Sequence, residues 1–338
     1  MAFRAPSHAL RRAVSTVLVL LGSWLAGTAA AQREPVKQPH PAPAAAPAGP
    51  ERVVMGMYVV DVPSFELKSS TYSADFYLWV RWNGARDATG YEIMNGSGEA
   101  CVLGLARAQG AEHYAVYRCH YQFHGNFDLR DYPLDKHELT VQVEDKALTQ
   151  GELVYVPDVA NTSLDSGISI PGWDVGRPRM WVRTHNYTAL GDPTYPHGTR
   201  TPYSRLVLAI PISRSGSATY LKSFLVMFLS VGVGLLASAL HSEHVEARLG
   251  IGVASIFGVV SSYLVVSQAL PETSQFTLAD QLHLVGMGSV FLSIMVSVAA
   301  YRLLKRLGEA RAERLDRVLG LATTALYVVA TVAVTVLR

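Results

Sequence analysis

Residues 220–270 decide the fold class of this chain. They read YLKSFLVMFLSVGVGLLASAL, then HSEHVEAR, then LGIGVASIFGVVSSYLVVSQAL, so that two apolar runs flank a short polar segment. Each apolar run has about the 20 residues that a helix needs to cross a hydrocarbon core. Two further runs of this kind follow at residues 278–304 and 318–337. The sequence therefore predicts an all-α transmembrane domain of four helices over residues 217–338.

The second of these runs contains more small and polar residues than a lipid-facing helix needs. Steps of three and four residues place one stripe of it on a single helix face: Glu246, Gly250, Ala254, Phe257, Ser261, Leu264 and Gln268. In a ring of such helices, this stripe would line a pore. Glu246 would form a carboxylate ring at one mouth, and the bulky Phe257 and Leu264 would form an apolar constriction that gates by dewetting. The alternative is a packed membrane anchor in which Gly and Ser only permit close helix approach.

Basic residues indicate how the helices are oriented. The turn at 271–276, between the second and third runs, contains no Lys or Arg. The ends of the third and fourth runs and their connection contain Arg302, Lys305, Arg306, Arg311, Arg314 and Arg317. The positive-inside rule places this connection in the cytoplasm. Four spans then put both the N-terminal domain and Arg338 on the periplasmic side.

The N-terminus has the features of a secretory signal peptide. Basic residues precede an apolar run over 14–26 that is too short to span a bilayer. Small residues follow, and we expect cleavage after Ala31, which makes residues 1–31 the signal peptide. Residues 32–50 are dominated by Pro and Ala without apolar periodicity, so they are expected to form a poorly ordered leader.

Residues 51–216 consist of short runs of alternating polarity. Examples are FYLWVRW (76–82), LTVQV (139–143) and LVLAI (206–210), separated by clusters of Gly, Pro, Asn and Asp. This spacing of short strands and turns is typical of a β-sandwich. We therefore predict a periplasmic all-β sandwich of about ten strands ahead of the helices.

The two cysteines, Cys101 and Cys119, are expected to form a disulfide. Residues 99–106 and 113–121 look like strands around a turn centred on Gly110, which sets the cysteines directly opposite each other. Directly opposite residues bring their Cβ atoms within about 4.5–5.5 Å, close to the separation that a disulfide accepts. Export to an oxidising compartment favours the bond. The alternative is a pair of buried free thiols.

Composition argues against several classes of function. The chain has 338 residues, 49% of them apolar and 17% charged, with a net charge of +2. This balance gives no basic footprint for nucleic acid, which we do not expect as a partner. No Ser-His-Asp order, phosphate loop or paired-carboxylate spacing stands out, so we expect neither an enzyme nor a cofactor. His241 and His244 are spaced so that they can bind a metal, but a solvated pair is the preferred interpretation.

Three motifs carry a resemblance to a known family. DLRDYPLD (128–135) is similar to an aromatic-Pro-x-Asp loop tip, while EAR (246–248) and LPET (270–273) bracket the second helix. With this order of sandwich and helices, residues 51–338 resemble the pentameric ligand-gated ion channels, the superfamily of nicotinic and glycine receptors and their bacterial relatives. The loop disulfide of eukaryotic members is missing, as in the bacterial branch, because its positions fall at about Gly125 and Leu139.

The resemblance implies a homopentamer around a central pore, built from heterologous contacts that close into a ring. Ligand would bind between neighbouring sandwiches and open the pore. The residues implied at the interface between sandwich and helices are Tyr132, Pro133, Asp135, Arg214 and Pro271. Asp135 and Arg214 are expected to form an ion pair there. The alternative is that Asp135 only bonds its own turn.

A resemblance to amine-gated bacterial members also implies an agonist site. The implied positions are Glu92, Glu144, Tyr187 and Tyr203 on one subunit, with Tyr77 and Trp79 from its neighbour. Carboxylates among aromatic faces suit an ammonium group. Lys146 stands where that branch has an aromatic residue, and its charge would repel an amine or recruit the carboxylate of an amino acid. We expect a small amine or zwitterion; alternatively, Tyr187 and Tyr203 only pack the strands.

The carboxylate of Glu246 predicts a channel that selects monovalent cations. The alternative is that Glu246 only pairs with Arg248 on the same helix. The expected partners are identical subunits, a small-molecule agonist, permeating cations and the lipid of a bacterial inner membrane. The rival function is a non-conducting membrane receptor or sensor with the same ligand-binding sandwich.

Overall fold

The described part of the chain, in this computed structural model, comprises residues 49–337 without 85, 189–192, 194–195, 215, 273 and 308. The predicted signal peptide, residues 32–48 of the predicted leader and Arg338 lie outside it. Strands extend to Arg214, and the membrane-type helices begin at Gly216.

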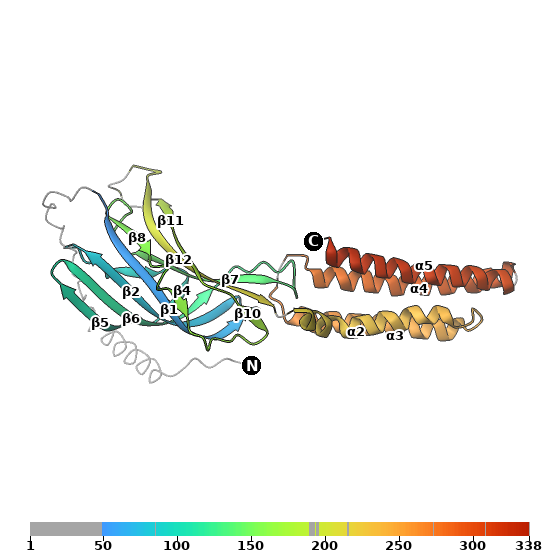
Figure 1. Cartoon of the computed structure of the whole chain (residues 1–338). Coiled ribbons are helices and arrows are strands. Elements are labelled where there is room, and N and C mark those ends of the chain that lie inside the picture. The colour runs from blue at the N-terminus through green and yellow to red at the C-terminus, as the bar shows by residue number, and fades with distance from the viewer. Residues whose placement is uncertain are drawn as a thin grey trace, which may run out of the picture. The chain divides into compact units, whose positions relative to one another are not determined.

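Among the described residues, twelve strands form two sheets ahead of the helices (Figure 1). The first sheet contains β1 (Glu51–Glu66), β2 (Thr71–Asn83), β4 (Gly96–Gly98), β5 (Val102–Gln109), β6 (Glu112–His124), β8 (Leu153–Pro157) and β9 (Ser163–Leu164). The second contains β3 (Tyr91–Ile93), β7 (Lys136–Asp145), β10 (Trp173–Val175), β11 (Arg179–Thr188) and β12 (Arg200–Arg214). The predicted all-β domain is confirmed. It has more strands than the ten or so expected, because strands as short as β9 carry no periodic signal.

The two sheets share one hydrophobic core. Phe76, Leu78 and Val80 of β2 are fully buried and alternate with more exposed residues, the two-residue period of a strand with one covered face. They belong to the same buried cluster as the inner side chains of β7 and β12. Tyr72 Oη of β2 also donates a 2.5 Å hydrogen bond to the carbonyl oxygen of Thr140 in β7. The layers are therefore joined by apolar packing and by this polar contact.

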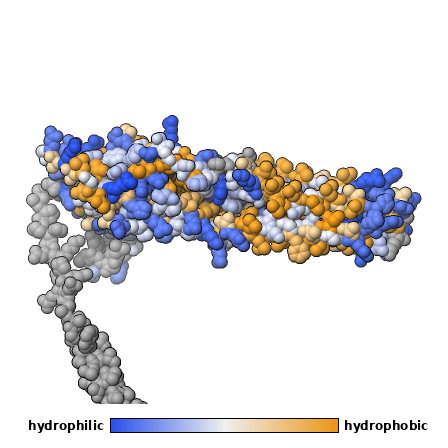
Figure 2. Space-filling model, turned by 90° about the horizontal axis from the view of Figure 1, so that it is seen from below, coloured by the Kyte–Doolittle hydropathy of each residue, from blue (hydrophilic) through white to orange (hydrophobic). Residues whose placement is uncertain are grey.

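Four long helices follow, namely α2 (Gly216–Leu236), α3 (Val245–Gln268), α4 (Leu278–Leu307) and α5 (Glu309–Val336). A single 3-10 turn, η1 (Ala237–Ala239), extends α2. All four are long and apolar enough to cross a membrane. α3 packs on α2 and α4, and α5 packs on α4 (Figure 1). The surface of the helices is largely apolar and becomes hydrophilic at the end with the α2–α3 connection (Figure 2). These helices are compatible with a multi-pass membrane protein.

Three helices begin before the apolar runs that predicted them, and α2 is one of them, since it starts at Gly216 rather than at residue 220. α5 begins at Glu309 rather than at residue 318, and α3 begins at Val245 rather than at residue 249. The segment EARAERLDR that opens α5 consists of good helix formers apart from Asp316, although its charges precede the apolar run that marked the span. The expected connection between the third and fourth helices is therefore mostly helical, since α4 extends to Leu307.

The predicted disulfide is confirmed. β5 and β6 form a hairpin whose turn contains Gly110 at φ 61°, a left-handed conformation that glycine adopts without strain. The pairing ends with Val102 opposite Arg118. Cys101 therefore lies opposite Cys119, and the bonded residues have Cα atoms 4.4 Å apart. Because all residues of β5 are exposed, the bond fastens a strand that buries little surface of its own.

Candidate functional site

The stripe predicted on α3 lies on the exposed side of that helix. All of its members, from Glu246 to Gln268, are exposed in the single chain, and Phe257 retains 68% of its surface. The opposite side is buried and consists of Arg248, Gly252, Ser255, Val259, Ser262 and Val266. Small residues thus lie on two faces of this helix, and only the buried face packs within the chain.

Close packing explains two of the glycines in α3. A Cβ atom at Gly252 would come within 2.4 Å of the Ile294 side chain in α4, and one at Gly258 within 2.3 Å of Ser230 in α2. Gly250 has no such neighbour within 4 Å. The packing interpretation therefore holds for the buried face of α3 and leaves the exposed stripe unexplained.

Arg248 anchors the base of α3 inside the bundle. The residue is 1% exposed, and its guanidinium donates to Asp316 of α5 through Nη1–Oδ1 (3.0 Å) and Nη2–Oδ2 (2.5 Å). Nη2 also donates to the carbonyl oxygens of Ser238 and Leu240. Arg248 thus pairs across helices, and not with Glu246 as the alternative interpretation of Glu246 had it. The sequence signal that points to Asp316 is a carboxylate only two residues before an apolar run.

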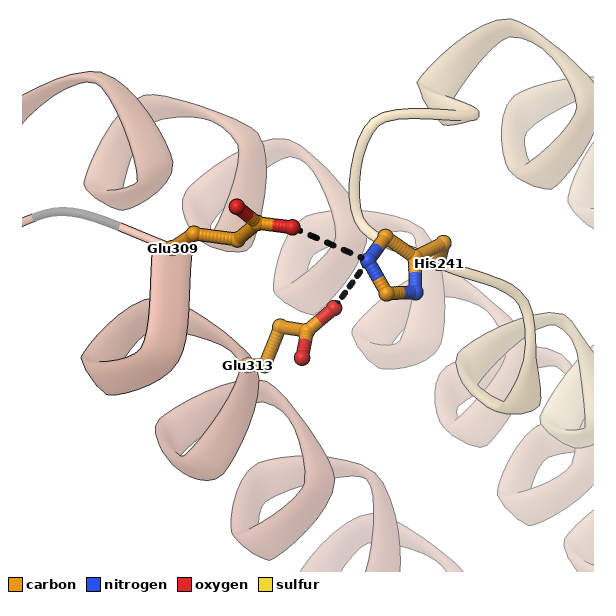
Figure 3. Close-up of side chains that lie close together, drawn as sticks. All are labelled: His241, Glu309 and Glu313. Atoms are coloured by element: carbon orange, nitrogen blue, oxygen red, sulfur yellow. Dashed lines mark ion pairs between the residues drawn. The ribbon is translucent and has the colours of Figure 1, made fainter.

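His241 does not pair with His244. Its Nε2 contacts Glu313 Oε1 and lies 3.6 Å from Glu309 Oε1 (Figure 3). His241 belongs to the α2–α3 connection, whereas both glutamates belong to the first turns of α5. His244 precedes α3 as its N-cap residue. Sequence spacing drew attention to the two histidines and not to the glutamates, because it cannot show that α5 passes beside this connection.

Asp135 and Arg214 form the ion pair that the sequence led us to expect. Arg214 Nε donates a 2.8 Å hydrogen bond to Asp135 Oδ1, and the carboxylate is fully buried. His137 Nε2 lies 2.6 Å from Asp135 Oδ2. The guanidinium also stacks on Tyr132 and Trp173, with its Cζ atom 4.8 and 4.5 Å from the ring centroids. His137 and Trp173 are members of this cluster that the sequence reasoning did not include.

The 128–135 loop contacts the connection between α3 and α4. Leu278 N at the start of α4 donates a 2.8 Å hydrogen bond to the carbonyl oxygen of Arg130. Leu129 N donates a 2.7 Å hydrogen bond to Gln275 Oε1. Pro271 lies in the same connection, and Pro133 is buried in the loop. Any displacement of this loop therefore acts directly on the segment between α3 and α4.

Glu144 is not a free carboxylate. It is 2% exposed and forms an ion pair with Arg205 of β12, the strand paired with β7 in the sheet. Tyr187 Oη donates a 2.8 Å hydrogen bond to Glu144 Oε2 and accepts one of 2.9 Å from Arg205 Nη2. Burial and the neighbouring Glu144 carboxylate raise the pKa of Tyr187, so the phenol stays protonated. The charge of Glu144 is therefore already matched within the chain.

Arg205 was missed although the sequence contains a signal for it. It lies two residues after Tyr203, and the two-residue period of a strand places both on one face. The ring of Tyr203 meets that of Tyr187 edge to face, with the centroids 5.4 Å apart. The predicted residues Glu144, Tyr187 and Tyr203 therefore do lie together, with Arg205 in the centre of the group.

Glu92 and Lys146 line a separate cavity of about 500 Å³. Glu92 lies opposite Glu144 in the β3–β7 pairing, but both cavity residues are exposed. The aromatic lining consists of Tyr91, Tyr117 and Tyr121. Burial raises the pKa of all three phenols, and the Glu92 carboxylate raises that of Tyr121 further. The cavity thus combines opposite charges with neutral aromatic rings, of which the sequence reasoning named only the charges.

Tyr77 and Trp79 lie on β2, in the first sheet, whereas Glu92, Glu144, Tyr187 and Tyr203 belong to the second. The Arg118 guanidinium lies over the Tyr77 ring at 4.7 Å. Trp79 Nε1 donates a 3.1 Å hydrogen bond to Asp158 Oδ2. Their contribution to the site of an adjacent subunit stays a prediction.

No protein-family model matches this chain, and no curated protein matches it significantly. The likeness to pentameric channels therefore rests on the residues quoted above and on the order of a β-domain and four apolar helices.

Proposed function

We propose that this chain is one subunit of a homopentameric ligand-gated ion channel whose pore is lined by α3. The observation that carries the proposal is the exposed stripe on α3 from Glu246 to Gln268. Polar side chains at membrane depth are costly in lipid and face a bundle interior or a water-filled cavity. Assembly of copies in a ring would turn the stripe towards such a cavity. Five copies is the number implied by the family resemblance.

Strands β7 and β12 provide a route from the ligand region to the helices. β7 contains Glu144 near its end and begins directly after Asp135, while β12 contains Arg205 and ends at Arg214. The two strands are paired along most of their length. A ligand that prefers one arrangement of these strands would shift the ion pair and the loop bonded to α4, and so bias the pore.

The test is ligand-evoked current from purified full-length protein in planar bilayers, after its assembly state is measured by light scattering. We expect pentamers that conduct when an agonist is added. The rival non-conducting receptor predicts saturable ligand binding without current. That result, obtained with intact pentamers, would refute the channel function.

Cation selectivity is expected from Glu246, because a carboxylate ring at a pore mouth attracts cations at close range. Reversal potentials should follow the sodium or potassium gradient in the wild type, and Glu246→Gln should move them towards the chloride potential. Glu243→Gln is the matched control, since Glu243 is exposed in the α2–α3 connection but precedes the helix. Wild-type reversal potentials that follow chloride would contradict the prediction.

The ligand class we propose is a small amine or zwitterion, with a zwitterion favoured by the charges at the cavity. The Glu144 carboxylate is neutralised by Arg205, so the charges available to a ligand are those of Glu92 and Lys146. These match an ammonium and a carboxylate respectively. The tyrosine rings beside them offer cation-π contacts of about 0.5–2 kcal/mol each.

Variants of the cavity separate the ligand classes. For a zwitterionic agonist, Glu92→Gln or Lys146→Met should raise the half-maximal concentration at least about tenfold, since a hydrogen bond to a charged group contributes about 1.5–3 kcal/mol. For an amine without a carboxylate, Lys146→Met should improve activation. Glu112→Gln, at the exposed β5–β6 turn, is the control. Activation by purely anionic compounds that depends on Lys146 and not on Glu92 would overturn this assignment.

A further inference from the structure

Three metal-ligand side chains meet at the hydrophilic end of the helices, and none of them belongs to the proposed pore stripe or the ligand cavity. His241 comes from the α2–α3 connection, and Glu309 and Glu313 come from α5 (Figure 3). The glutamates are four residues apart, so they project from one face of the helix. One ligand atom from each of the three side chains lies within 4.8 Å of the other two.

We propose that His241, Glu309 and Glu313 bind a transition-metal dication of the zinc class. One imidazole nitrogen and two carboxylates make a three-ligand set that Zn²⁺ accepts, with water in the fourth position. The imidazole disfavours Mg²⁺ and Ca²⁺, which prefer oxygen ligands. The 3.6 Å between His241 Nε2 and Glu309 Oε1 is too long for a hydrogen bond. That separation is close to the ~3.4 Å between two ligands bound at ~2.1 Å to a tetrahedral ion, whereas Glu313 Oε1 contacts His241 Nε2 directly and would have to move away from it to share the ion.

A buried hydroxyl next to His241 in the chain is a second observation that points to a ligand. His241, Ser242 and Glu313 line a cavity of about 330 Å³. Ser242 is 1% exposed, and its Oγ has no hydrogen-bond partner among the described residues. Buried polar groups are usually paired with protein or ordered water. A water bound to the metal would supply the partner that this hydroxyl lacks.

The site lies beside the anchor of α3. Asp316, which pairs with Arg248, lines the same cavity, and Arg248 donates to the carbonyl oxygen of Leu240, the neighbour of His241. A metal held by His241 and Glu313 would therefore tie the α2–α3 connection to α5 at the base of α3. The binding itself does not depend on the proposed channel function.

A simple ion pair is the alternative. Carboxylates are favoured in the first turn of a helix, and a protonated His241 would complement them without a metal. This alternative predicts no metal uptake by the cluster, so direct measurement of zinc binding distinguishes the two.

The experiment uses full-length protein in detergent, purified without a polyhistidine tag and dialysed against micromolar zinc chloride. We expect about one zinc ion per chain, a higher melting temperature with zinc, and no displacement by equimolar Mg²⁺. His241→Ala, Glu309→Gln and Glu313→Gln should each lower zinc affinity at least about tenfold. Glu309 is largely exposed, so its variant tests the site with little risk to folding.

His244→Ala and Glu243→Gln are the matched controls, because both residues are exposed in the same connection. They should bind zinc as the wild type does. The proposal is overturned if the wild type takes up no zinc, or if His241→Ala and Glu309→Gln bind it with unchanged affinity. It is also overturned if His244→Ala abolishes binding as fully as His241→Ala, since the ligands would then be the two histidines.

Discussion

Replacing Asp316 with alanine is expected to destabilise the helical domain by about 3–5 kcal/mol, the usual cost of removing one partner of a buried ion pair. The Arg248 side chain is fully buried and bonds Asp316 through both terminal nitrogens. Without the carboxylate, a guanidinium charge would remain inside the bundle with only carbonyl oxygens as partners. The measurement is the apparent melting temperature and the size-exclusion profile of the protein in detergent.

Two comparisons make this result specific to the ion pair. Arg248→Met combined with Asp316→Leu should recover most of the lost stability, because apolar replacements of a buried pair are often neutral. Glu309→Ala removes an exposed carboxylate from the same helix and should have little effect in zinc-free buffer. An Asp316→Ala protein with the melting temperature of the wild type would show that Asp316 does not hold Arg248.

Phe257→Ala is expected to produce current in the absence of ligand. Phe257 is 68% exposed in the single chain, so any packing partner of its ring lies in another copy of the chain or in the lipid. In the proposed ring, it narrows the pore together with Leu264, and loss of the ring would let water enter the constriction. We expect basal current to rise at least about tenfold, which requires a shift of about 1.4 kcal/mol in the closed–open equilibrium.

Val329→Ala is the control for this prediction. Val329 is an exposed apolar residue of α5, so its truncation also removes exposed apolar surface from a membrane-spanning helix. Basal current should stay at the wild-type level. If Phe257→Ala channels close as the wild type does and keep its agonist sensitivity, Phe257 packs between subunits and the gate lies elsewhere.

Much of the fold could be predicted from local patterns in the sequence. The two-residue alternation in 76–82 predicted a strand, and the apolar runs from residue 220 onward predicted helices. Both patterns can be seen in the sequence because they depend only on which nearby residues lie on the same face of one element. The spacing of Cys101 and Cys119 around Gly110 gave the disulfide for the same reason. The apolar runs did not predict the starts of the helices, since the charged start of α5 is helical without being apolar.

The face of α3 that remains exposed also followed from the sequence. Steps of three and four residues define the stripe, and all of its members are left exposed in the chain, together with Ala247, Val253 and Val265. The sequence could not show which small residues of α3 pack against a neighbouring helix and which stay exposed. Gly252 packs against Ile294 while Gly250 has no close neighbour, a difference that depends on where α4 crosses.

The sequence by itself therefore determined a β-domain followed by four apolar helices, one hairpin disulfide and one unusual helix face. The Asp135–Arg214 pair was also expected, but only the tertiary structure decided the partners of three other charged or titratable groups. Glu144 meets Arg205, Arg248 meets Asp316, and His241 meets two glutamates of α5. The physical reason is that periodicity reports which side of an element a residue occupies, whereas a charge is neutralised by whichever group the packing of distant segments brings within hydrogen-bond distance.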